Sequence, residues 1–399
     1  MEMAHFPGNI AMESGAGLSG SLPEILLPEG VRLVKTVVLG VPETGILFFA
    51  GQWRGVGGKG SIRHGGTGDR IRFAGFRLKP VDVACYNIIS VFCRFRPAGR
   101  PIRSHRRTLM ESGRTTIRLV YPQWQGGIVS HWMPELAPDD ASRGYWLGAQ
   151  LLNMLAPAGS AKTVQVPVSL DISERKIENG IMDYAIIVAQ TKAALATLEV
   201  ENPDAVVTLG GECSVSVPPF AYLAAKYPDD VALVWLDAHP DICLPYDEYT
   251  GYHAMAVTAL MGMGDEKLAQ MLPGRIDPSR ILIAGLRSWD KGMQERQREL
   301  GIRGLSPQEV ARDSSAILDW LKETGASKTL IHFDLDVLDP AEIIAGVGVE
   351  PGGMKMDEAV RVINDIAAAT DLVGLTIAEP MPRLAIRLKN MLSKMPLLG

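Results

Sequence analysis

Residues 231–241 read Val-Ala-Leu-Val-Trp-Leu-Asp-Ala-His-Pro-Asp. Six apolar residues without a polar interruption are typical of a strand that is buried on both faces of a parallel sheet. The acidic and imidazole groups begin where the apolar run stops, at Asp237, His239 and Asp241. In open parallel sheets, ligands bind at the carboxyl ends of the strands. The stretch therefore predicts a parallel α/β sheet with a polar site along one edge.

Three further apolar runs end in acids or a thiol: residues 329–333 before Asp334 and Asp336, residues 205–209 before Glu212 and Cys213, and residues 372–377 before Glu379. Carboxylates that are packed together raise one another's pKa, and a metal ion removes that penalty. Oxygen and imidazole ligands suit divalent ions such as Mn²⁺. The two Asp-x-His and Asp-x-Asp segments therefore predict a site for two metal ions that share ligands.

From residue 115 onward, short apolar runs alternate with helical patterns. The expected strands are 164–170, 205–209, 231–236, 280–285, 329–333 and 372–377, and the expected helices include 180–198 and 355–369. Such alternation favours a mainly parallel sheet with helices on both faces.

Residues 1–114 differ from the rest of the chain. They carry 16 Lys and Arg against 8 Asp and Glu, a net charge of +8, whereas the remainder carries −13. We weigh an accessory domain, a basic disordered arm, and translated sequence upstream of a true start at Met110. The glycine-rich composition and the lack of long apolar periodicity favour a poorly structured extension. The Gly-x-Gly-x-x-Gly match at 55–60 is interpreted as a loop, because Ser-Ile-Arg-His-Gly-Gly after it does not favour a helix.

Composition limits the partners and the compartment. The net charge of −5 gives no electrostatic case for nucleic acid or an anionic membrane, and an arginine cluster at 103, 106 and 107 is weak support for a nucleic-acid-binding arm. The early apolar stretch 33–50 is too interrupted to cross a membrane, and residues 1–20 lack the features of a signal peptide. The four cysteines form no Cys-x-x-Cys pair, so we expect a reducing, cytoplasmic environment.

The seven histidines fall into two kinds. His239 and His253 lie in polar motifs, whereas the other five stand outside any such context. We expect ordinary surface or loop residues at positions 5, 64, 105 and 131, and a hydrogen-bonded core residue at His332, inside an apolar strand.

Taken together, the motifs resemble those of the arginase/agmatinase/formiminoglutamase (ureohydrolase) family over residues 115–399. In chain order they are Gly-Gly-Glu-Cys-Ser (210–214), Asp-Ala-His-Pro-Asp (237–241), Gly-Tyr-His-Ala-Met (251–255), Gly-Leu-Arg (285–287), Phe-Asp-Leu-Asp-Val-Leu-Asp-Pro (333–340), Glu-Pro-Gly-Gly (350–353) and Ala-Glu-Pro (378–380). The resemblance implies a three-layer α/β/α sandwich, a trimer or hexamer of identical chains, and a small guanidino or amidino substrate.

The resemblance also implies roles for single residues. One metal ion would be held by Cys213, Asp237, Asp241 and Asp334, and the second by Asp237, His239, Asp334 and Asp336. Asp241 would orient a hydroxide held between the two ions, which attacks the central carbon of the substrate. His253 would carry protons, and Glu379 would pair with the guanidinium group. The implied cofactors are two divalent ions, and the resemblance to the family favours manganese.

The sequence departs from the family pattern at four places. Cys213 stands where the family has a histidine ligand, with Glu212 before it in place of Asp. A thiolate there would favour zinc or iron(II), whereas a buried, non-ligating cysteine would leave the site short of one ligand. Cys243 replaces an asparagine that contacts substrate, Tyr252 is bulkier than the usual residue, and the loop 345–353 is shorter and lacks threonines. These changes argue against L-arginine itself as the substrate.

Two functions from different classes therefore remain open. The first is a metal-dependent hydrolase of a guanidino or amidino C–N bond. The second is a family member that keeps the fold with an incomplete metal site and acts as a binding or regulatory protein. Cys213 favours the second, whereas the retained His253 and Glu379 favour catalysis.

Overall fold

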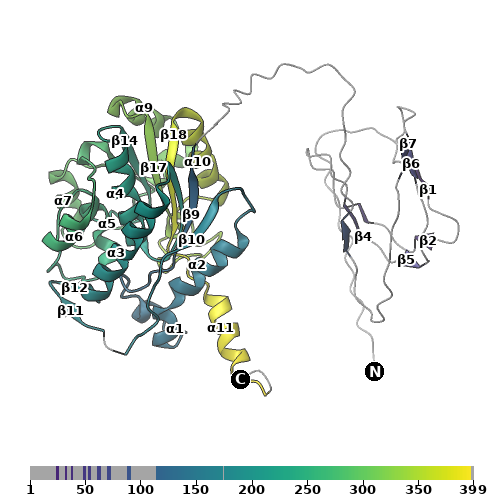
Figure 1. Cartoon of the computed structure of the whole chain (residues 1–399), viewed down its shortest axis with the longest axis horizontal. Coiled ribbons are helices and arrows are strands. Elements are labelled where there is room, and N and C mark those ends of the chain that lie inside the picture. Colours follow the sequence, from purple (N-terminus) through teal and green to yellow (C-terminus); the bar gives the residue numbers. More distant parts are fainter. Residues whose placement is uncertain are drawn as a thin grey trace. The chain divides into compact units, whose positions relative to one another are not determined.

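The computed structural model describes residues 114–173 and 175–396, together with eight short strands between residues 24 and 90. The chain divides into two units, Met1–Thr108 and Leu109–Gly399. Figure 1 traces both units, and each is described by itself. The expectation of a poorly structured extension over residues 1–114 falls largely outside the described residues and stays a prediction.

The eight strands of the first unit form three small antiparallel sheets, ordered β1-β6-β7, β2-β5 and β3-β4-β8. Their bounds are β1 Glu24–Leu26, β2 Arg32–Leu33, β3 Val37–Val38, β4 Phe48–Ala50, β5 Trp53–Arg54, β6 Ser61–Arg63, β7 Arg70–Arg72 and β8 Ile88–Ser90. The glycine-rich segment 55–60 lies outside the described residues. Strand β6 follows it directly, so no helix begins there as a dinucleotide-binding loop would require.

Outside the described residues lie several other positions singled out above: His5, His64, His105, the arginines at 103, 106 and 107, and Met110. None of the described helices combines the length and the hydropathy that a membrane span requires.

The second unit is built on one eight-stranded sheet, ordered β10-β9-β13-β18-β17-β14-β15-β16, in which every neighbouring pair is parallel. The strands are β9 Thr116–Tyr121, β10 Lys162–Gln165, β13 Ala205–Gly210, β14 Val231–Leu236, β15 Ile281–Ala284, β16 Arg303–Leu305, β17 Lys328–Asp334 and β18 Asp371–Ala378. A two-stranded hairpin, β11 (Ile177–Glu178) and β12 (Ile181–Met182), stands apart from the sheet.

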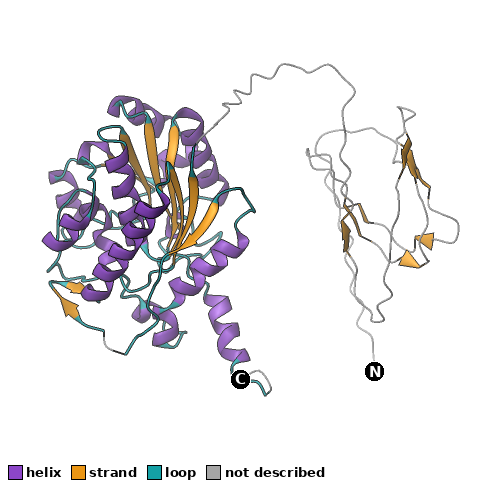
Figure 2. Ribbon diagram, viewed as in Figure 1, coloured by secondary structure: helices purple, strands orange, loops and turns teal. Residues whose placement is uncertain are grey.

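The helices of the second unit cover both faces of this sheet (Figure 2). They are α1 Pro138–Ser142, α2 Gly144–Leu155, α3 Tyr184–Glu201, α4 Val217–Lys226, α5 Ala256–Leu260, α6 Glu266–Met271, α7 Met293–Glu299, α8 Pro307–Arg312, α9 Ser315–Thr324, α10 Met356–Ala369 and α11 Arg383–Leu392. The prediction of a three-layer α/β/α sandwich with a mainly parallel sheet is therefore confirmed.

Strand β14 shows how the residue pattern builds the two cores. Leu233 and Trp235 pack in the hydrophobic cluster that contains residues of α3, α4 and α5. Val234 and Leu236 pack in the cluster that contains residues of α8, α9 and α10. Because successive side chains of a strand point to opposite faces, a strand that is buried on both faces needs a continuous apolar run, which residues 231–236 supply.

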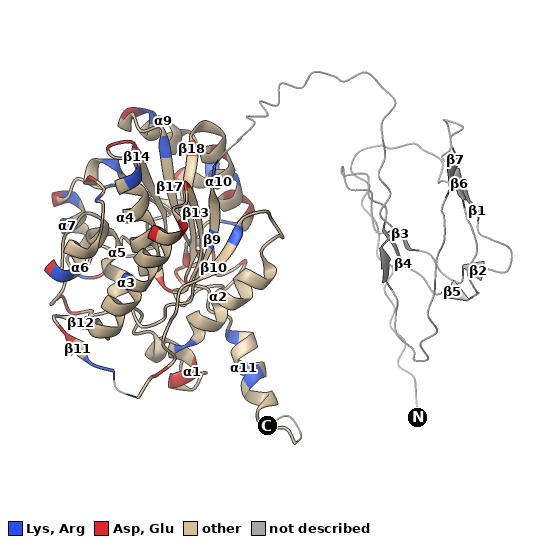
Figure 3. Ribbon diagram, in the orientation of Figure 1, with Lys and Arg blue, Asp and Glu red and all other residues tan. Residues whose placement is uncertain are grey.

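The strand and helix boundaries differ from expectation where the apolar pattern is weak. The expected strand 164–170 corresponds to β10, which ends at Gln165. Strand β16 has only three residues, and no apolar run in the sequence predicts it. The expected helix 180–198 is preceded by the β11–β12 hairpin and begins at Tyr184. Figure 3 shows charged residues of both signs on helices α6, α7 and α9.

One close approach between α2 and the segment after β18 bears on the site. A Cβ atom at Gly148, within α2, would lie 1.9 Å from the carbonyl oxygen of Pro380. Pro380 directly follows Glu379, so the absence of a side chain at residue 148 lets the helix hold this segment in place. A backbone atom cannot move aside as a flexible side chain can.

We predict that Gly148→Ala lowers the free energy of unfolding by roughly 1–3 kcal/mol, because the added methyl group overpacks the contact with Pro380. Alanine would otherwise favour the helix by about 1 kcal/mol. Urea denaturation measures the change. Gly159→Ala is the control, since a Cβ there meets nothing within 4 Å. An unchanged or raised stability of Gly148→Ala would contradict the close packing.

Candidate metal centre

The carboxyl ends of four strands meet at the middle of the sheet, because β13, β18, β17 and β14 are neighbours in that order. The register aligns Leu236 of β14 with Phe333 of β17, and Asp334 of β17 with Ala378 of β18. The residues that follow or end these strands are Asp237, Asp334 and Glu379. The structure therefore brings the polar groups of separate motifs to one edge.

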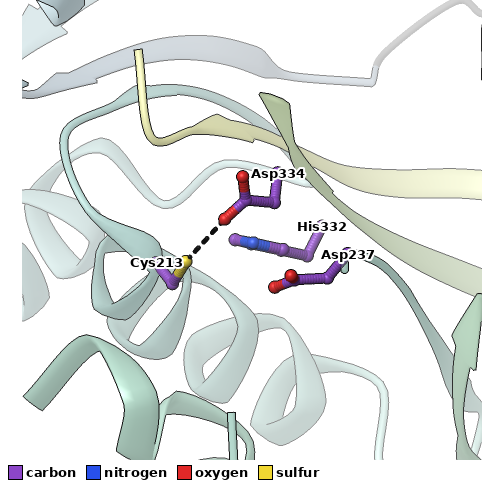
Figure 4. A group of neighbouring side chains, drawn as sticks. All are labelled: Cys213, Asp237, His332 and Asp334. Atoms are coloured by element: carbon purple, nitrogen blue, oxygen red, sulfur yellow. Dashed lines mark hydrogen bonds between the residues drawn. The ribbon is translucent and has the colours of Figure 1, made fainter. Parts of the chain in front are cut away.

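A first group of possible ligands consists of Cys213, Asp237, His332 and Asp334, all of which are buried. One ligand atom from each lies within 4.8 Å of the others. Figure 4 shows the ring of His332 extending between the two carboxylates toward Cys213. The thiol of Cys213 donates to Oδ2 of Asp334 over 3.0 Å.

A second group consists of Asp237, His239 and Asp336. Nδ1 of His239 lies 3.2 Å from Oδ2 of Asp336 and 3.5 Å from Oδ1 of Asp237. Asp237 belongs to both groups, so a single carboxylate with two oxygens lies between two candidate ion positions. This is the arrangement that two metal ions with a shared ligand require.

Local hydrogen bonds orient the carboxylates. The indole Nε1 of Trp235 donates to Oδ2 of Asp237 over 2.8 Å, and the backbone N–H of His239 donates to Oδ1 over 2.7 Å. Oδ1 of Asp334 accepts the N–H of Asp336 over 2.6 Å at the start of a short 3₁₀ turn, Leu335–Val337. Each strand thus ends in a turn that its own aspartate caps, which fixes where the remaining carboxylate lone pairs point.

Asp241 is buried and has a positive φ of 48°, which is uncommon for a residue with a side chain. Its Oδ2 has no hydrogen-bond partner in the described part of the chain. An ionised oxygen that is buried without a partner is unfavourable unless a cation is bound. The orphaned oxygen therefore fits a metal ion at this position.

The pKa values of the acids follow from the same crowding. Burial, and then the charge of Asp336, raises the pKa of Asp237 to about 6. Burial, and then neighbouring aspartates, holds the pKa of both Asp241 and Asp334 well above the ordinary value. Without a cation, this edge of the sheet therefore favours protonated acids, and a bound cation would favour their ionised forms.

Asp336 and His239 form the exception, because they pair with each other. Burial would raise the pKa of Asp336, but the attraction of His239 dominates and lowers it to about 2. Burial would likewise lower the pKa of His239, and Asp336 instead holds it well above the ordinary value. Protonated His239 therefore supplies part of the positive charge that a second ion would supply.

His253, Glu379 and Cys213 form a third group beside the first. Nδ1 of His253 lies 3.2 Å from Oε1 of Glu379, and its Nε2 lies 2.6 Å from the hydroxyl of Tyr249. The hydroxyl of Tyr145 donates to the other oxygen of Glu379. The pKa of His253 is held well above its ordinary value: burial opposes the charge, but Tyr249, Glu379 and Asp241 together favour it.

Burial, followed by the charges of Asp241 and Asp334, raises the pKa of the Cys213 thiol well above its ordinary value. The thiol is therefore protonated without a cation. Glu212, before it, points away from the centre: its carboxylate accepts from Gln123 over 2.8 Å and from the Ser214 hydroxyl over 2.9 Å. Glu212 thus fixes the turn that presents Cys213.

The loop 345–353 packs directly on the second group. A Cβ at Gly348 would lie 2.5 Å from Oδ2 of Asp336, and Arg287 donates to the backbone oxygens of Asp336 and Glu350, each over 2.8 Å. The other two departures lie in the core. The thiol of Cys243 lies 4.0 Å from the sulfur of Met293, and Tyr252 is buried with a hydroxyl that has no hydrogen-bond partner among the described residues.

Sequence reasoning missed two contributors to the site. Tyr145 and Tyr249 come from segments with no pattern that indicates chemistry, and only the folded chain brings them to it. Arg287 lies in the Gly-Leu-Arg motif, but the motif does not predict that it binds the backbone oxygen of Asp336. His332 is buried and hydrogen-bonded at Nδ1 to the Ser216 hydroxyl over 2.7 Å, so the expectation of a hydrogen-bonded core residue is confirmed. Its place beside Asp334 follows from strand alternation, because residues i and i+2 share a face.

The comparisons with known protein families and with known proteins agree with one another. The model of the family described as "Arginase family" matches residues 154–393. Arginase from Eremothecium gossypii is 32% identical over 188 residues, which are 45% of this chain and 47% of that protein, so the chain spans about half the length of this relative. N(omega)-hydroxy-L-arginine amidinohydrolase from Streptomyces lavendulae is 29% identical over 49% of this chain and 70% of its own.

Among solved structures, arginase from Entamoeba histolytica in complex with L-ornithine superposes with a TM-score of 0.55. The match covers 67% of this chain and 91% of that one, at 20% sequence identity. At this identity the likeness shows the fold alone.

We predict that Asp241→Asn raises the free energy of unfolding of the metal-free protein near neutral pH. The folded-state pKa of Asp241 is raised, and its unfolded value is about 3.9, so ionisation of this group opposes folding. The opposition is absent below the unfolded pKa and grows as pH rises toward the folded value. The gain should therefore vanish near about pH 4 and grow as the pH rises toward the raised folded-state pKa of Asp241, as urea denaturation across pH measures.

Saturating Mn²⁺ should reverse this order, because ligand binding to the folded state stabilises wild type more than the variant. Asp319→Asn on the exposed face of α9 is the control and should change neither series. A metal-free Asp241→Asn protein that is less stable than wild type near pH 8 would refute the electrostatic account.

Proposed function

The chain belongs to the arginase family, and we propose that it is a metal-dependent hydrolase of a C–N bond in a linear guanidino or amidino compound. The observation that carries the proposal is the pair of ligand groups that share Asp237 at the strand ends. The orphaned Oδ2 of Asp241 and the raised pKa values of Asp237 and Asp334 support it.

Two divalent ions would be held by these residues. The first would be bound by Cys213, Asp237, Asp241 and Asp334, and the second by Asp237, His239, Asp334 and Asp336. Bound ions of this kind lower the pKa of water toward neutrality and stabilise negative charge on the substrate. Manganese suits the carboxylate-rich second set, whereas a sulfur ligand in the first set favours a softer ion.

His253 and its neighbours would handle the proton. Its imidazole lies between the Glu379 carboxylate and the Tyr249 hydroxyl, so one nitrogen faces the centre and the other is held by a hydrogen bond. Its raised pKa favours the protonated form near neutral pH, which suits delivery of a proton to a leaving amine. Glu379 would also orient the cationic amidine by charge-assisted hydrogen bonds.

The substrate is a small guanidino or amidino compound other than L-arginine. Relatives differ in this respect, because one is named as an arginase and another as an N(omega)-hydroxy-L-arginine amidinohydrolase. The thiol of Cys243 lies 4.0 Å from the sulfur of Met293, at the position where the resemblance leads us to expect a carboxylate-binding amide for arginine. A homo-oligomer of three or six chains and a cytoplasmic location stay predictions.

The competing function is a binding or regulatory protein that retains the fold with an incomplete metal site. The observation that favours it is Cys213, whose protonated thiol already donates to Asp334. The hydrogen-bonded chain from Tyr249 through His253 to Glu379 favours catalysis, because a binding protein has no need for a proton carrier.

We expect the purified full chain, loaded with Mn²⁺ or Zn²⁺, to release urea or ammonia from at least one member of a panel of guanidino and amidino compounds. Asp334→Asn should lower turnover by more than about a thousandfold and lower the metal content with it, because the variant loses a charged ligand. Product assay and elemental analysis on the same samples measure both quantities.

Asp319→Asn again serves as the control and should retain both activity and metal. Full turnover by Asp334→Asn would remove the metal-dependent mechanism. Two bound ions in wild type without turnover on any member of the panel would favour the binding protein.

Tyr249→Phe should lower kcat about 10- to 100-fold with little change in KM, because it removes the hydroxyl that holds Nε2 of His253. Tyr249 also raises the pKa of His253, so the alkaline limb of the kcat–pH profile should move to lower pH in the variant. The exposed Tyr246 provides the control variant, Tyr246→Phe. A change confined to KM would contradict a role for Tyr249 in positioning the proton carrier.

A further inference from the structure

We propose that His332 is a direct ligand of the first metal ion, and that this ion is bound by a mixed set of imidazole nitrogen, Cys213 sulfur and carboxylate oxygen. The inference rests on the proposed function only in taking the strand-end site to bind metal. It adds a ligand from within β17, two residues before Asp334 at the end of that strand.

The position of His332 in the sheet points its ring at the site. His332 lies two residues before Asp334 in β17, so the two side chains share a face. On the neighbouring strand it is paired with Trp235, and the two rings stack with centroids 3.5 Å apart and planes 8° apart. The stack and the buried surroundings hold the ring in one orientation.

One ring nitrogen is occupied and the other is available. Nδ1 lies 2.7 Å from the Ser216 hydroxyl, whereas Nε2 is buried and has no hydrogen-bond partner in the described part of the chain. When Nδ1 carries the proton and donates to Ser216, Nε2 presents a lone pair. Histidine ligands of metals have this arrangement, with the second nitrogen held by a neighbour.

The distances suit one ion. A ligand atom from each of Cys213, Asp237, His332 and Asp334 lies within 4.8 Å of the other three. Ligand atoms that lie at about 2.0–2.3 Å from one ion are roughly 3–3.5 Å apart, so small side-chain rotations would bring these four groups to the ion. The thiol proton of Cys213 now lies between its sulfur and Oδ2 of Asp334. When an ion displaces this proton, both atoms have lone pairs that are free to bind the ion.

A buried water is the alternative occupant. The hydroxyls of Thr208 and Thr376 are also buried and have no hydrogen-bond partner within the residues that the structure describes. Thr376 is paired with His332 across β17 and β18. A water among these groups would satisfy Nε2 without a metal ion. The ligand set favours a metal ion over a water, because it combines a nitrogen and a sulfur ligand. Such ligands favour zinc, cobalt or iron(II) over manganese.

The test uses the full chain, stripped of metal with a chelator and titrated with Co²⁺ alone. Wild type should show the thiolate-to-cobalt charge-transfer band that a bound Cys213 sulfur gives. His332→Phe, which keeps an aromatic ring against Trp235, should bind the first ion more than about 100-fold more weakly, beyond the loss typical of an outer-shell change. Ser216→Ala should weaken it about 10-fold, because it releases the ring.

His131→Phe removes an exposed imidazole elsewhere in the unit and should leave affinity and spectrum unchanged. Unchanged first-ion affinity and spectrum in a folded His332→Phe protein would overturn the inference. If that variant does not fold, X-ray absorption of the loaded wild type decides: two imidazoles per two ions are expected, and one imidazole refutes the assignment.

The outcomes separate this inference from the proposed function. Metal bound through His332 without turnover would remove the hydrolase and leave the ligand assignment standing. Turnover by a protein whose ions make no bond to His332 would refute the ligand assignment and leave the hydrolase standing.

Discussion

Mutual repulsion among buried carboxylates is the constraint around which the second unit is organised. Asp237, Asp241 and Asp334 come from the ends of two parallel strands and are almost completely removed from water. Burial and proximity raise the pKa of all three, so the folded chain disfavours their ionised forms. Bound cations would balance such an arrangement, and Asp237, which belongs to two groups of possible ligands, is the residue that the proposed pair of ions would share.

The scaffold around these acids is rigid at the points where rigidity matters. Trp235 both stacks on His332 and donates to Asp237, so one aromatic side chain orients the carboxylate that follows its own strand β14 and the imidazole on the neighbouring strand β17. Arg287 ties the end of β17 to the loop that carries Glu350 through backbone oxygens. Close packing at Gly348 brings that loop onto Asp336. The ligand positions are therefore set by the fold before any ion binds.

The sequence alone predicts the sheet well and the site in part. Runs such as 231–236 predict a doubly buried strand, because six apolar residues in succession that end at Asp237 are too few for a typical buried helix. Short strands such as β16 carry too few residues for a pattern. Within the site, the acids that end the strands are visible as motifs, whereas Tyr145 and Tyr249 reach Glu379 and His253 through tertiary packing alone. His332 is hidden for another reason: an imidazole in an apolar run has the same sequence appearance whether it binds a hydroxyl or an ion.

The most direct test of this account is the number of divalent ions that bind to the purified full chain. Native mass spectrometry after equilibration with Mn²⁺ and Zn²⁺, in separate samples, counts them. The account predicts two ions per chain in wild type and a loss of bound ion when Asp237, which both ligand groups share, is replaced by Asn. A chain that binds no ion at saturating concentrations of either metal would contradict it.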